Sequence, residues 1–240
     1  MFKIDNETIK KRILFLIKTN WIKTIWFNFK HLPLKQAVCL PIFISYHTRI
    51  KCDRKSLIII DLQKVMGGGR IGMVKLGYEN MPVQVVKANP LSLCLKEQSS
   101  ITFKGFCVIS AGTQIYLYKG ASLSIGENTR IGMNVKIYSK KSITIGDYCT
   151  FGWDSQVVDT DFHDVINVQN GEKHTQSKEI VIGDRCWICS NCSIKKGTIL
   201  PDDVIVGSNS LCNKVYDVPK YSLIGGTPAK LLKSGLTYKQ

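Results

Sequence analysis

Between residues 125 and 212, mostly aliphatic residues recur at every sixth position in three blocks, with a slip of two positions after the first block. The series runs in three blocks: Ile125, Ile131 and Ile137; Ile145, Phe151 and Val157; and Ile182, Ile188, Ile194, Leu200, Val206 and Cys212. An amphipathic helix would repeat near 3.6 residues, and a half-buried strand would alternate over a short run and then turn. Neither explains a period of six over this length, so the pattern indicates an internal structural repeat.

A second series of mostly small or β-branched residues lies two positions before the first. Its members are Leu123, Thr129, Val135, Ile143, Cys149, Ser155, Cys186, Cys192, Thr198, Val204 and Ser210. We interpret each six-residue unit as a short strand plus a corner. Three units close one triangular coil, and the coils stack into a column whose axis is filled by both series. Glycine after the aliphatic residue, as at Gly126 and Gly146, permits the corner.

Residues 6–30 follow a helical pattern instead, with apolar residues three or four positions apart. The apolar residues are Ile9, Ile13, Leu16, Ile17, Trp21, Ile25 and Trp26, and the opposite face carries Lys10, Lys11, Lys18 and Lys23. Asp5 or Asn6 is a suitable N-cap. This basic amphipathic helix has two interpretations that stay open. It packs on the column or a neighbouring subunit, or it attaches to a membrane surface through anionic lipids.

These patterns divide the chain into two parts. Residues 1–55 form a basic helical N-terminal segment, and residues 56–240 form the column. Residues 56–104 are expected to make irregular first coils, with the glycine triplet 67–69 turning a loop. The segment 231–235 is expected to cap the open end of the column.

Composition restricts the class of protein further. The 240 residues carry a formal net charge of +15, and residues 1–55 hold 12 basic and 3 acidic side chains. With 44% hydrophobic and 21% charged residues, the chain is not intrinsically disordered. Nucleic-acid binding would require basic patches with interleaved aromatic residues on the column, whereas the basic excess lies in the helical segment.

The compartment is inferred from the cysteines and from the N-terminus. No apolar run approaches the roughly 20 residues that cross a bilayer, and no signal peptide is evident. Nine cysteines without such a signal are typical of a reducing compartment with free thiols. We therefore expect a cytoplasmic protein, with the basic helix as the part that can contact the inner face of the membrane.

The period of six fails between Val157 and Ile182. The intervening segment, at about 158–180, is polar and too long for one coil. Insertions in a solenoid form loops on one face, often the binding face. The segment is therefore predicted to be a catalytic loop.

Three residues of this loop are the candidate catalytic group. If the preceding strand continues, Asp159, Asp161 and His163 lie on the same side of it, because side chains alternate along a strand. A carboxylate beside an imidazole can hold its tautomer and stabilise the cation formed on proton uptake. His163 is the predicted general base, and His174 of the same loop is the second choice.

The repeat resembles that of the hexapeptide-repeat acyltransferases, in particular the maltose and galactoside O-acetyltransferase group. The resemblance covers about residues 100–235 and is strongest from Gly146 onward. It implies a mainly β fold, a left-handed parallel β-helix with an N-terminal helical segment and a short C-terminal cap. It also implies a homotrimer whose active sites lie between neighbouring columns. His163 matches the catalytic histidine of the group.

The same resemblance implies an acyl-CoA co-substrate, acetyl-CoA, and its contacts. Trp187 lies in a segment similar to the strand that leads to the cofactor. Ser190 matches a residue near the thioester, and Ser208 a small residue that lets the backbone approach the pantetheine arm. Cys189 stands where relatives usually have glycine, and its side chain is expected to narrow the groove.

Four further residues match cofactor contacts of this group. Asn213 and Lys214 match contacts of the next coil. Lys230 and Lys233 fall where relatives carry arginines for the CoA phosphates. Lysine lacks the bidentate fork of arginine, so looser phosphate recognition is expected.

No metal is expected. The spacing of Cys186, Cys189 and Cys192 is similar to part of a metal motif, but the repeat phase turns Cys186 and Cys192 into the column as structural residues. A zinc hydratase on this fold would need three histidines from facing subunits, and of the four here only His163 lies at a coil.

The sequence therefore predicts an acetyl-CoA-dependent O-acetyltransferase that acts on a hydroxyl of a sugar or glycan precursor by direct transfer. Two alternatives stay open. One is N- or O-acylation of an amino sugar or amino acid, because a histidine base serves amines and hydroxyls alike. The other is a non-catalytic β-helix scaffold.

Overall fold

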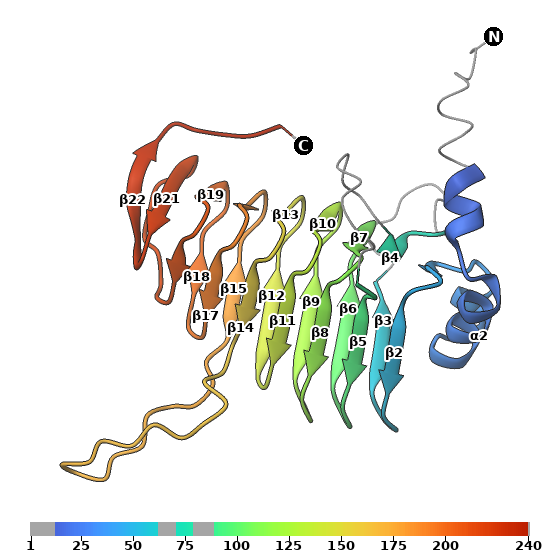
Figure 1. The fold of residues 1–240 in the computed structure, drawn as a ribbon, viewed down its shortest axis with the longest axis horizontal. Coiled ribbons are helices and arrows are strands. Elements are labelled where there is room, and N and C mark those ends of the chain that lie inside the picture. The colour runs from blue at the N-terminus through green and yellow to red at the C-terminus, as the bar shows by residue number, and fades with distance from the viewer. Residues whose placement is uncertain (1–12, 62–70, 79–88, 240) are drawn as a thin grey trace.

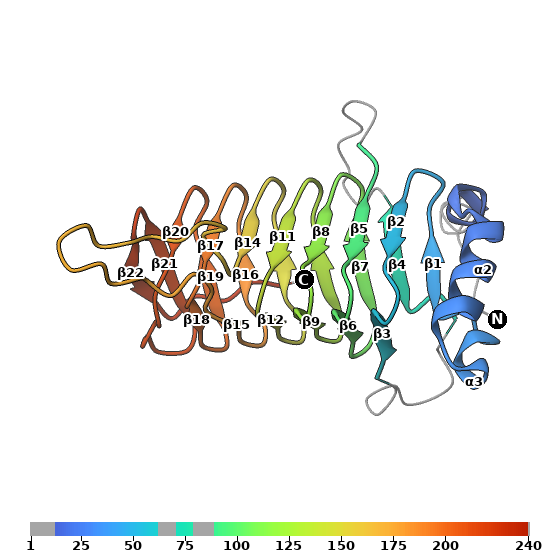
Figure 2. The ribbon, with the colours of Figure 1, turned by 90° about the horizontal axis from the view of Figure 1, so that it is seen from below.

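The protein folds into an elongated column with helices at one end and a long arm near the other (Figure 1). The computed structural model describes residues 13–61, 71–78 and 89–239. Successive strands pass from one sheet to the next, so three parallel sheets form the three sides of the column (Figure 2). This is the stacked column that the repeat predicted and the left-handed parallel β-helix that the resemblance implied.

The strands of the described residues fall into the following sheets. The nine-stranded sheet contains β1 (Ile42–Ile44), β4 (Val74–Tyr78), β7 (Cys107–Ser110), β10 (Thr129–Ile131), β13 (Thr150–Phe151), β16 (Trp187–Ile188), β19 (Val204–Val206), β21 (Ser222–Gly226) and β22 (Ala229–Ser234). The seven-stranded sheet contains β2 (Arg49–Cys52), β5 (Ser92–Leu95), β8 (Gln114–Leu117), β11 (Lys136–Ser139), β14 (Gln156–Val158), β17 (Ser193–Lys195) and β20 (Leu211–Cys212). The six-stranded sheet contains β3 (Leu57–Ile60), β6 (Ser100–Phe103), β9 (Ser122–Ile125), β12 (Ser142–Ile145), β15 (Ile180–Ile182) and β18 (Ile199–Leu200).

The core lies along the column axis and consists of the two predicted series. Every member of both series is at most 2% exposed. Each aliphatic side chain meets its equivalents in the coils before and after, as where Ile137 pairs in register with Ile115 and with Val157. Stacking therefore buries one continuous apolar core, as the repeat predicted.

The small inward residues also hydrogen-bond one coil to the next. Thr129 Oγ1 donates to the carbonyl of Gly146 at 2.8 Å, and Cys149 Sγ donates to the carbonyl of Gly183 at 3.1 Å. At this corner the stacked backbones approach so closely that a Cβ on Gly146 would lie 2.6 Å from the carbonyl carbon of Gly183. Glycine is required here by the close approach of neighbouring coils.

The periodicity predicted one helix over residues 6–30, but the described part of this segment is divided in two. Residues 13–18 are helical, Thr19 then bridges to Ser45, and a new helix, α2 (Trp21–His31), begins after Asn20. The Asn20 side chain accepts a hydrogen bond from the backbone N–H of Lys23 at 3.0 Å and so caps α2. Local side-chain hydrogen bonds of this kind compete with a continuous helix. The expected caps at Asp5 and Asn6 lie outside the described residues.

Helix α2 covers the open end of the column. The exposed edge of β1 has unpaired backbone groups, and α2 supplies their partners. Asn28 Nδ2 donates to the carbonyl of Ile42 at 2.7 Å, and Asn28 Oδ1 accepts from the Ile42 N–H at 3.1 Å. Thr24 Oγ1 accepts from the Ile44 N–H at 3.1 Å. A short helix, α3 (Leu34–Ala37), continues the cover, which protects the sheet edge from pairing with another chain.

The first coils are more regular than predicted. β1 and β2 precede residue 56, at which we placed the start of the column, and they pair in parallel with β4 and β5. β3 and β6 pair along their whole length. The glycine triplet 67–69 lies outside the described residues.

At the other end, β22 turns back and pairs antiparallel with β21, which forms the short cap predicted from the sequence. The chain then runs back over the nine-stranded sheet, where the Tyr238 ring contacts Trp187 with centroids 5.3 Å apart. No helix in the described part of the chain is long and apolar enough to cross a membrane.

Candidate active site

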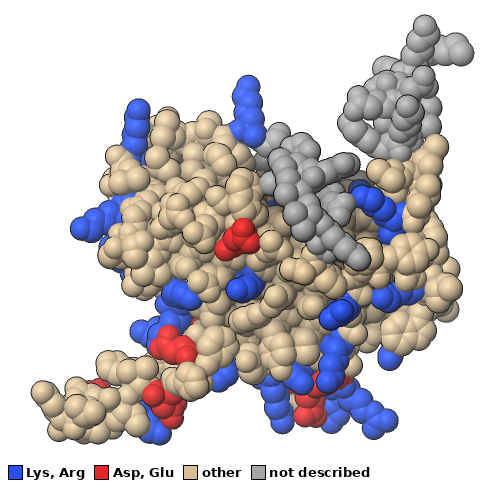
Figure 3. All heavy atoms as spheres, in the orientation of Figure 1, with Lys and Arg blue, Asp and Glu red and all other residues tan. Residues whose placement is uncertain are grey.

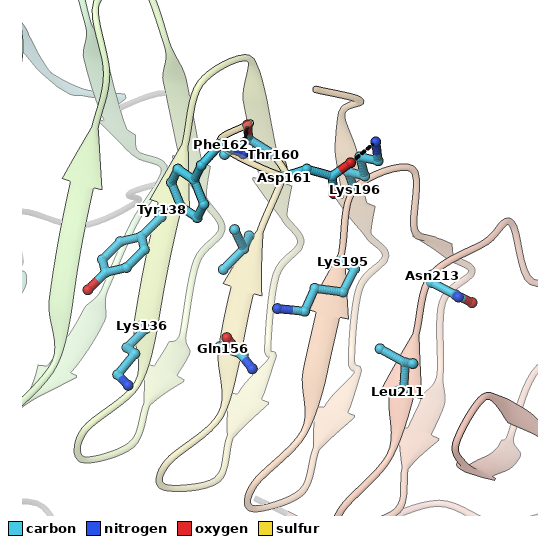
Figure 4. A pocket seen from close by; sticks show the side chains of 11 residues that line it. Lys136, Tyr138, Gln156, Thr160, Asp161, Phe162, Lys195, Lys196, Leu211 and Asn213 are labelled. Atoms are coloured by element: carbon cyan, nitrogen blue, oxygen red, sulfur yellow. Dashed lines mark hydrogen bonds and ion pairs between the residues drawn. The ribbon is translucent and has the colours of Figure 1, made fainter. Parts of the chain in front are cut away.

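A groove of about 740 Å³ lies on the seven-stranded sheet beside the point where the insertion leaves the column (Figure 4). Strands β11, β14, β17 and β20 form its floor, and the first residues of the insertion form one wall. Its floor presents Lys136, Tyr138, Gln156, Lys195 and Leu211. Aromatic, amide and cationic side chains therefore face the same hollow.

The insertion itself, residues 159–179, projects from the column as a two-stranded arm (Figure 1). Two isolated bridges join its strands, between Thr160 and Ser177 and between Ile166 and Lys173. The arm leaves between the seven-stranded and six-stranded sheets, because it connects β14 to β15. This agrees with the predicted loop on one face.

Asp159 anchors the root of the arm. Its side chain is fully buried, and its carboxylate accepts hydrogen bonds from Ser139 Oγ at 2.6 Å and from the backbone N–H groups of Lys140 at 2.7 Å and Lys141 at 2.9 Å. A buried carboxylate with three donors is well satisfied. These contacts tie the arm to the preceding coil.

Asp161 and His163 do not share a side with Asp159, because β14 ends at Val158 and the chain turns. Asp161 lies in the wall of the groove and forms an ion pair with Lys196, whose ammonium also donates to the Thr175 carbonyl at 2.6 Å. His163 is exposed on the arm. The expectation that one strand would align the three side chains is therefore wrong.

Phe162 connects His163 to the groove. The Phe162 ring lines the groove, with its centroid 6.1 Å from that of Tyr118 and 6.3 Å from that of Tyr138. Its backbone carbonyl accepts from Gln176 Nε2 at 3.1 Å, across the arm. His163 therefore directly follows a residue that is held in the wall of the groove.

The residues predicted to contact the co-substrate lie at different places on the column. Ser190 and Ser208 stack at the corner between the nine-stranded and seven-stranded sheets, with their Oγ atoms 3.3 Å apart. Asn213 lies in the groove near the opposite edge of the seven-stranded sheet, and Lys214 Nζ lies 5.5 Å over the Tyr216 ring. One chain therefore does not bring the serine corner and the arm together.

Three other predicted contacts lie on or beyond the nine-stranded sheet. Trp187 faces outward from β16 and is partly covered by Tyr238. Lys230 and Lys233 are exposed on β22 at the end of the column. None of the three lines the groove.

The cysteines are arranged as the repeat phase predicted. Cys186 and Cys192 are buried, and their thiols donate to the carbonyls of Pro201 and Gly207, each at 3.2 Å. Cys189 lies at the serine corner, where burial raises the pKa of its thiol to about 11. In the coil before, Gly152 occupies the equivalent corner position, and a Cβ there would lie 2.5 Å from the Ser190 nitrogen.

Sequence reasoning missed the floor of the groove. Lys136 and Tyr138 flank the inward residue Ile137, and Lys195 follows inward Ile194. Strand alternation therefore gives their outward direction, but not which of them meet. Burial lowers the pKa of Lys195, and Asp161 opposes this shift. The lysine is therefore partly desolvated in the groove.

Comparison with known proteins places these features in a class. The model for the hexapeptide repeat of succinyl-transferase matches residues 122–154 and 179–211. The structure of a polysialic-acid-specific acetyltransferase is similar in fold, with a TM-score of 0.52, 20% identity, and 81% of this chain and 89% of that chain covered. The repeats and this similarity define a hexapeptide-repeat β-helix.

Sequence relatives with this repeat include O-acetyltransferases. The chain is 29% identical to a polysialic acid O-acetyltransferase of Escherichia coli O1:K1 / APEC, over 50% of this chain and 39% of the relative. It is 27% identical to the galactoside O-acetyltransferase of E. coli K12, over 50% of this chain and 57% of the relative. The chain thus spans less than two thirds of either relative. Its repeats match the hexapeptide-repeat model and these relatives are O-acetyltransferases, as the resemblance implied.

Proposed function

We propose that the protein transfers an acetyl group from acetyl-CoA to a hydroxyl of a sugar or glycan precursor. The observation that carries this proposal is the groove on the seven-stranded sheet. Phe162 lines this groove, and His163 is the next residue in the chain. The relatives named as O-acetyltransferases of polysialic acid and of galactosides support the same class of reaction.

The groove suits a sugar acceptor. Tyr138 and Phe162 offer ring faces against which the apolar face of a sugar can stack, and Gln156 offers an amide for its hydroxyls. Lys136 and Lys195 add positive charge. This set of side chains favours an acceptor that carries a carboxylate or a phosphate.

The acyl donor would lie along the serine corner. Ser190 and Ser208 have short side chains, and the backbone at Gly207 is open enough that a Cβ there would meet its nearest neighbour only at 3.5 Å. Such a corner lets an extended pantetheine chain approach the backbone. The exposed Lys230 and Lys233 can attract its phosphates.

Because the serine corner and the arm lie on different edges of one column, we propose that the active site forms between two subunits of a homotrimer. The arm of one subunit would supply His163, and the neighbouring subunit would supply the serine corner. Closed symmetric assembly repeats the same contact at every interface.

His163 would act as general base. Its imidazole takes the proton of the acceptor hydroxyl as the oxygen attacks the thioester carbonyl, and later returns that proton to the leaving thiolate. Backbone N–H groups near Ser190 would stabilise the tetrahedral oxyanion; the loss of one such donor typically costs about 3 kcal/mol. Asp159 and Asp161 would act as positioning residues through their contacts with Ser139 and Lys196.

Replacement of the histidine tests this function. We expect His163→Ala to lower turnover about 10²–10⁴-fold, since general-base catalysis contributes that range, with acetyl-CoA binding unchanged. Thiol release would be measured with a panel of neutral, acidic and amino sugars, and binding by calorimetry. His174→Ala on the same arm is the matched control, and we expect it to stay near wild-type turnover.

Each other outcome has a definite meaning. Near-normal turnover of the His163→Ala protein would contradict the general base. Acetylation only of amino sugars or amino acids would favour the first alternative. Absence of thiol release from wild-type protein with every acceptor would favour a scaffold.

A further inference from the structure

Helix α2 buries Phe27 together with two polar residues and exposes most of its other apolar residues. Thr24 and Asn28 are fully buried against β1, where they satisfy its edge. Ile22, Ile25, Trp26 and Phe29 face away from the column and are 85%, 47%, 55% and 49% exposed. These four residues are spaced i, i+3, i+4 and i+7, so they form one stripe of the helix. We call this stripe the outer face of α2.

The apolar surface continues beyond this helix. In the residues that the structure describes, the preceding helical turns and α3 add further exposed apolar side chains: Ile13, Leu14, Leu16, Ile17, Leu34 and Val38. Contiguous exposed apolar patches of this kind mark interaction sites. The column does not need the outer face for its own folding, because the polar side of α2 already makes the contacts to β1.

Charged and aromatic residues beside the outer face indicate its partner. Trp21 and Trp26 are the amphipathic rings enriched at membrane interfaces. Lys30 Nζ lies 4.4 Å over the Trp26 ring, and Lys23 Nζ donates to the Thr48 carbonyl at 2.8 Å. Basic side chains outnumber acidic ones over the surface drawn in Figure 3. A second copy of the chain would bring like charges together, whereas anionic lipid would neutralise them.

We propose that the outer face of α2 docks on the surface of an anionic lipid bilayer. α2 has only 11 residues, so it lies in the interface and does not span it. In Figure 2 the helices occupy one end of the column, and the arm lies toward the other. Docking would therefore hold the protein by its helical end, with the groove further along the column. This inference does not depend on acetyl transfer.

Vesicle binding of the full chain tests the proposal. Flotation with phosphatidylcholine vesicles, with and without phosphatidylglycerol, gives the partition coefficient, and tryptophan fluorescence reports insertion of Trp21 and Trp26. We expect binding to the anionic vesicles, weakened by high salt, and a blue shift of emission. The partition coefficient of the double variant Ile22→Glu/Ile25→Glu should be lower than that of wild type by roughly tenfold or more. Val168→Glu, at an apolar residue of the arm that is 96% exposed, is the matched control and should bind like wild type.

Two further measurements distinguish lipid docking from unfolding of the variant and from a subunit contact at this face. Circular dichroism and thermal unfolding establish that the double variant is folded, as expected for substitutions at exposed positions. Sedimentation should give the same oligomeric state for wild type and variant. The proposal is overturned if the wild-type protein does not bind anionic vesicles, or if the double variant binds them as well as wild type. It is also overturned if the double variant has a different oligomeric state, because the face would then be a subunit contact.

Discussion

At the scale of single residues, Asp159 shows how a carboxylate in a candidate catalytic loop can act through structure. It is fully buried and accepts hydrogen bonds from Ser139 and from two backbone N–H groups of the preceding coil. The arm begins directly after it. The position of Phe162 and His163 therefore depends on a contact made at the corner of the column.

We expect Asp159→Asn to destabilise the protein by about 1–3 kcal/mol, because an amide nitrogen would face N–H donors and leave one of them unpaired. Thermal unfolding measures this effect. Turnover should fall with it, through misplacement of the arm, while the pH dependence of the remaining activity should stay that of wild type. A shifted pH profile would instead assign Asp159 a direct electrostatic effect on His163.

The matched control is Asp164→Asn on the same arm. Asp164 is exposed and pairs with Lys173 at 3.3 Å, and such surface pairs contribute about 0–1 kcal/mol. A loss of stability at Asp164 as large as that at Asp159 would contradict the anchoring role.

At the scale of elements, α2 ends the column by hydrogen bonding to the edge of β1 as well as by packing Phe27 into the core. Its Asn28 satisfies both backbone groups of Ile42, and its Thr24 satisfies the N–H of Ile44. An edge strand without such partners would be open to pairing with another chain. The polar side of the helix therefore satisfies the backbone groups at the edge of β1, and its outer apolar face stays available to another partner.

We expect Asn28→Leu to destabilise this end of the column by about 2–4 kcal/mol, since it leaves the Ile42 N–H and C=O buried without partners. Hydrogen exchange should become faster at the Ile42 amide and remain unchanged at Ile137 in the middle of the column. Asn170→Leu, at an exposed position of the arm, is the control and should alter neither site. Unchanged exchange at Ile42 would contradict the capping role of α2.

At the scale of the whole molecule, the separation of the serine corner from the arm determines how an active site can form. A single column presents Ser190 and Ser208 on one edge of the seven-stranded sheet and the arm on the other. Two columns side by side can bring these edges together. The proposed site is therefore a property of the assembly.

Subunit complementation tests this arrangement. We expect His163→Ala and Ser208→Trp each to lower transfer at least about 10²-fold when expressed alone, the second because a bulky ring fills the corner. Co-assembled subunits should recover roughly a quarter of the wild-type activity, since random mixing leaves that fraction of interfaces with both intact groups. Absence of recovery in demonstrated mixed oligomers would assign the site to one chain.

Prediction from sequence succeeded where structure repeats over short distances. The two inward series and the corners follow from residues six positions apart, and each coil stacks on a coil of the same kind. Prediction failed at Thr19 and Asn20, where a bridge to Ser45 and a side-chain cap divide a segment whose periodicity favoured one helix. It also failed beyond Val158, where the strand was expected to continue.

By itself, the sequence determined the column and its buried axis, because burial repeats every six residues and each repeat supports the next. Only the tertiary structure decided which outward side chains share a groove, since the stacking of four coils places Lys136 and Asn213 along the same hollow. It also decided which side of α2 is buried. The unpaired backbone of β1 selected Thr24 and Asn28 over the apolar stripe, because unsatisfied buried hydrogen-bonding groups cost more than exposed apolar surface.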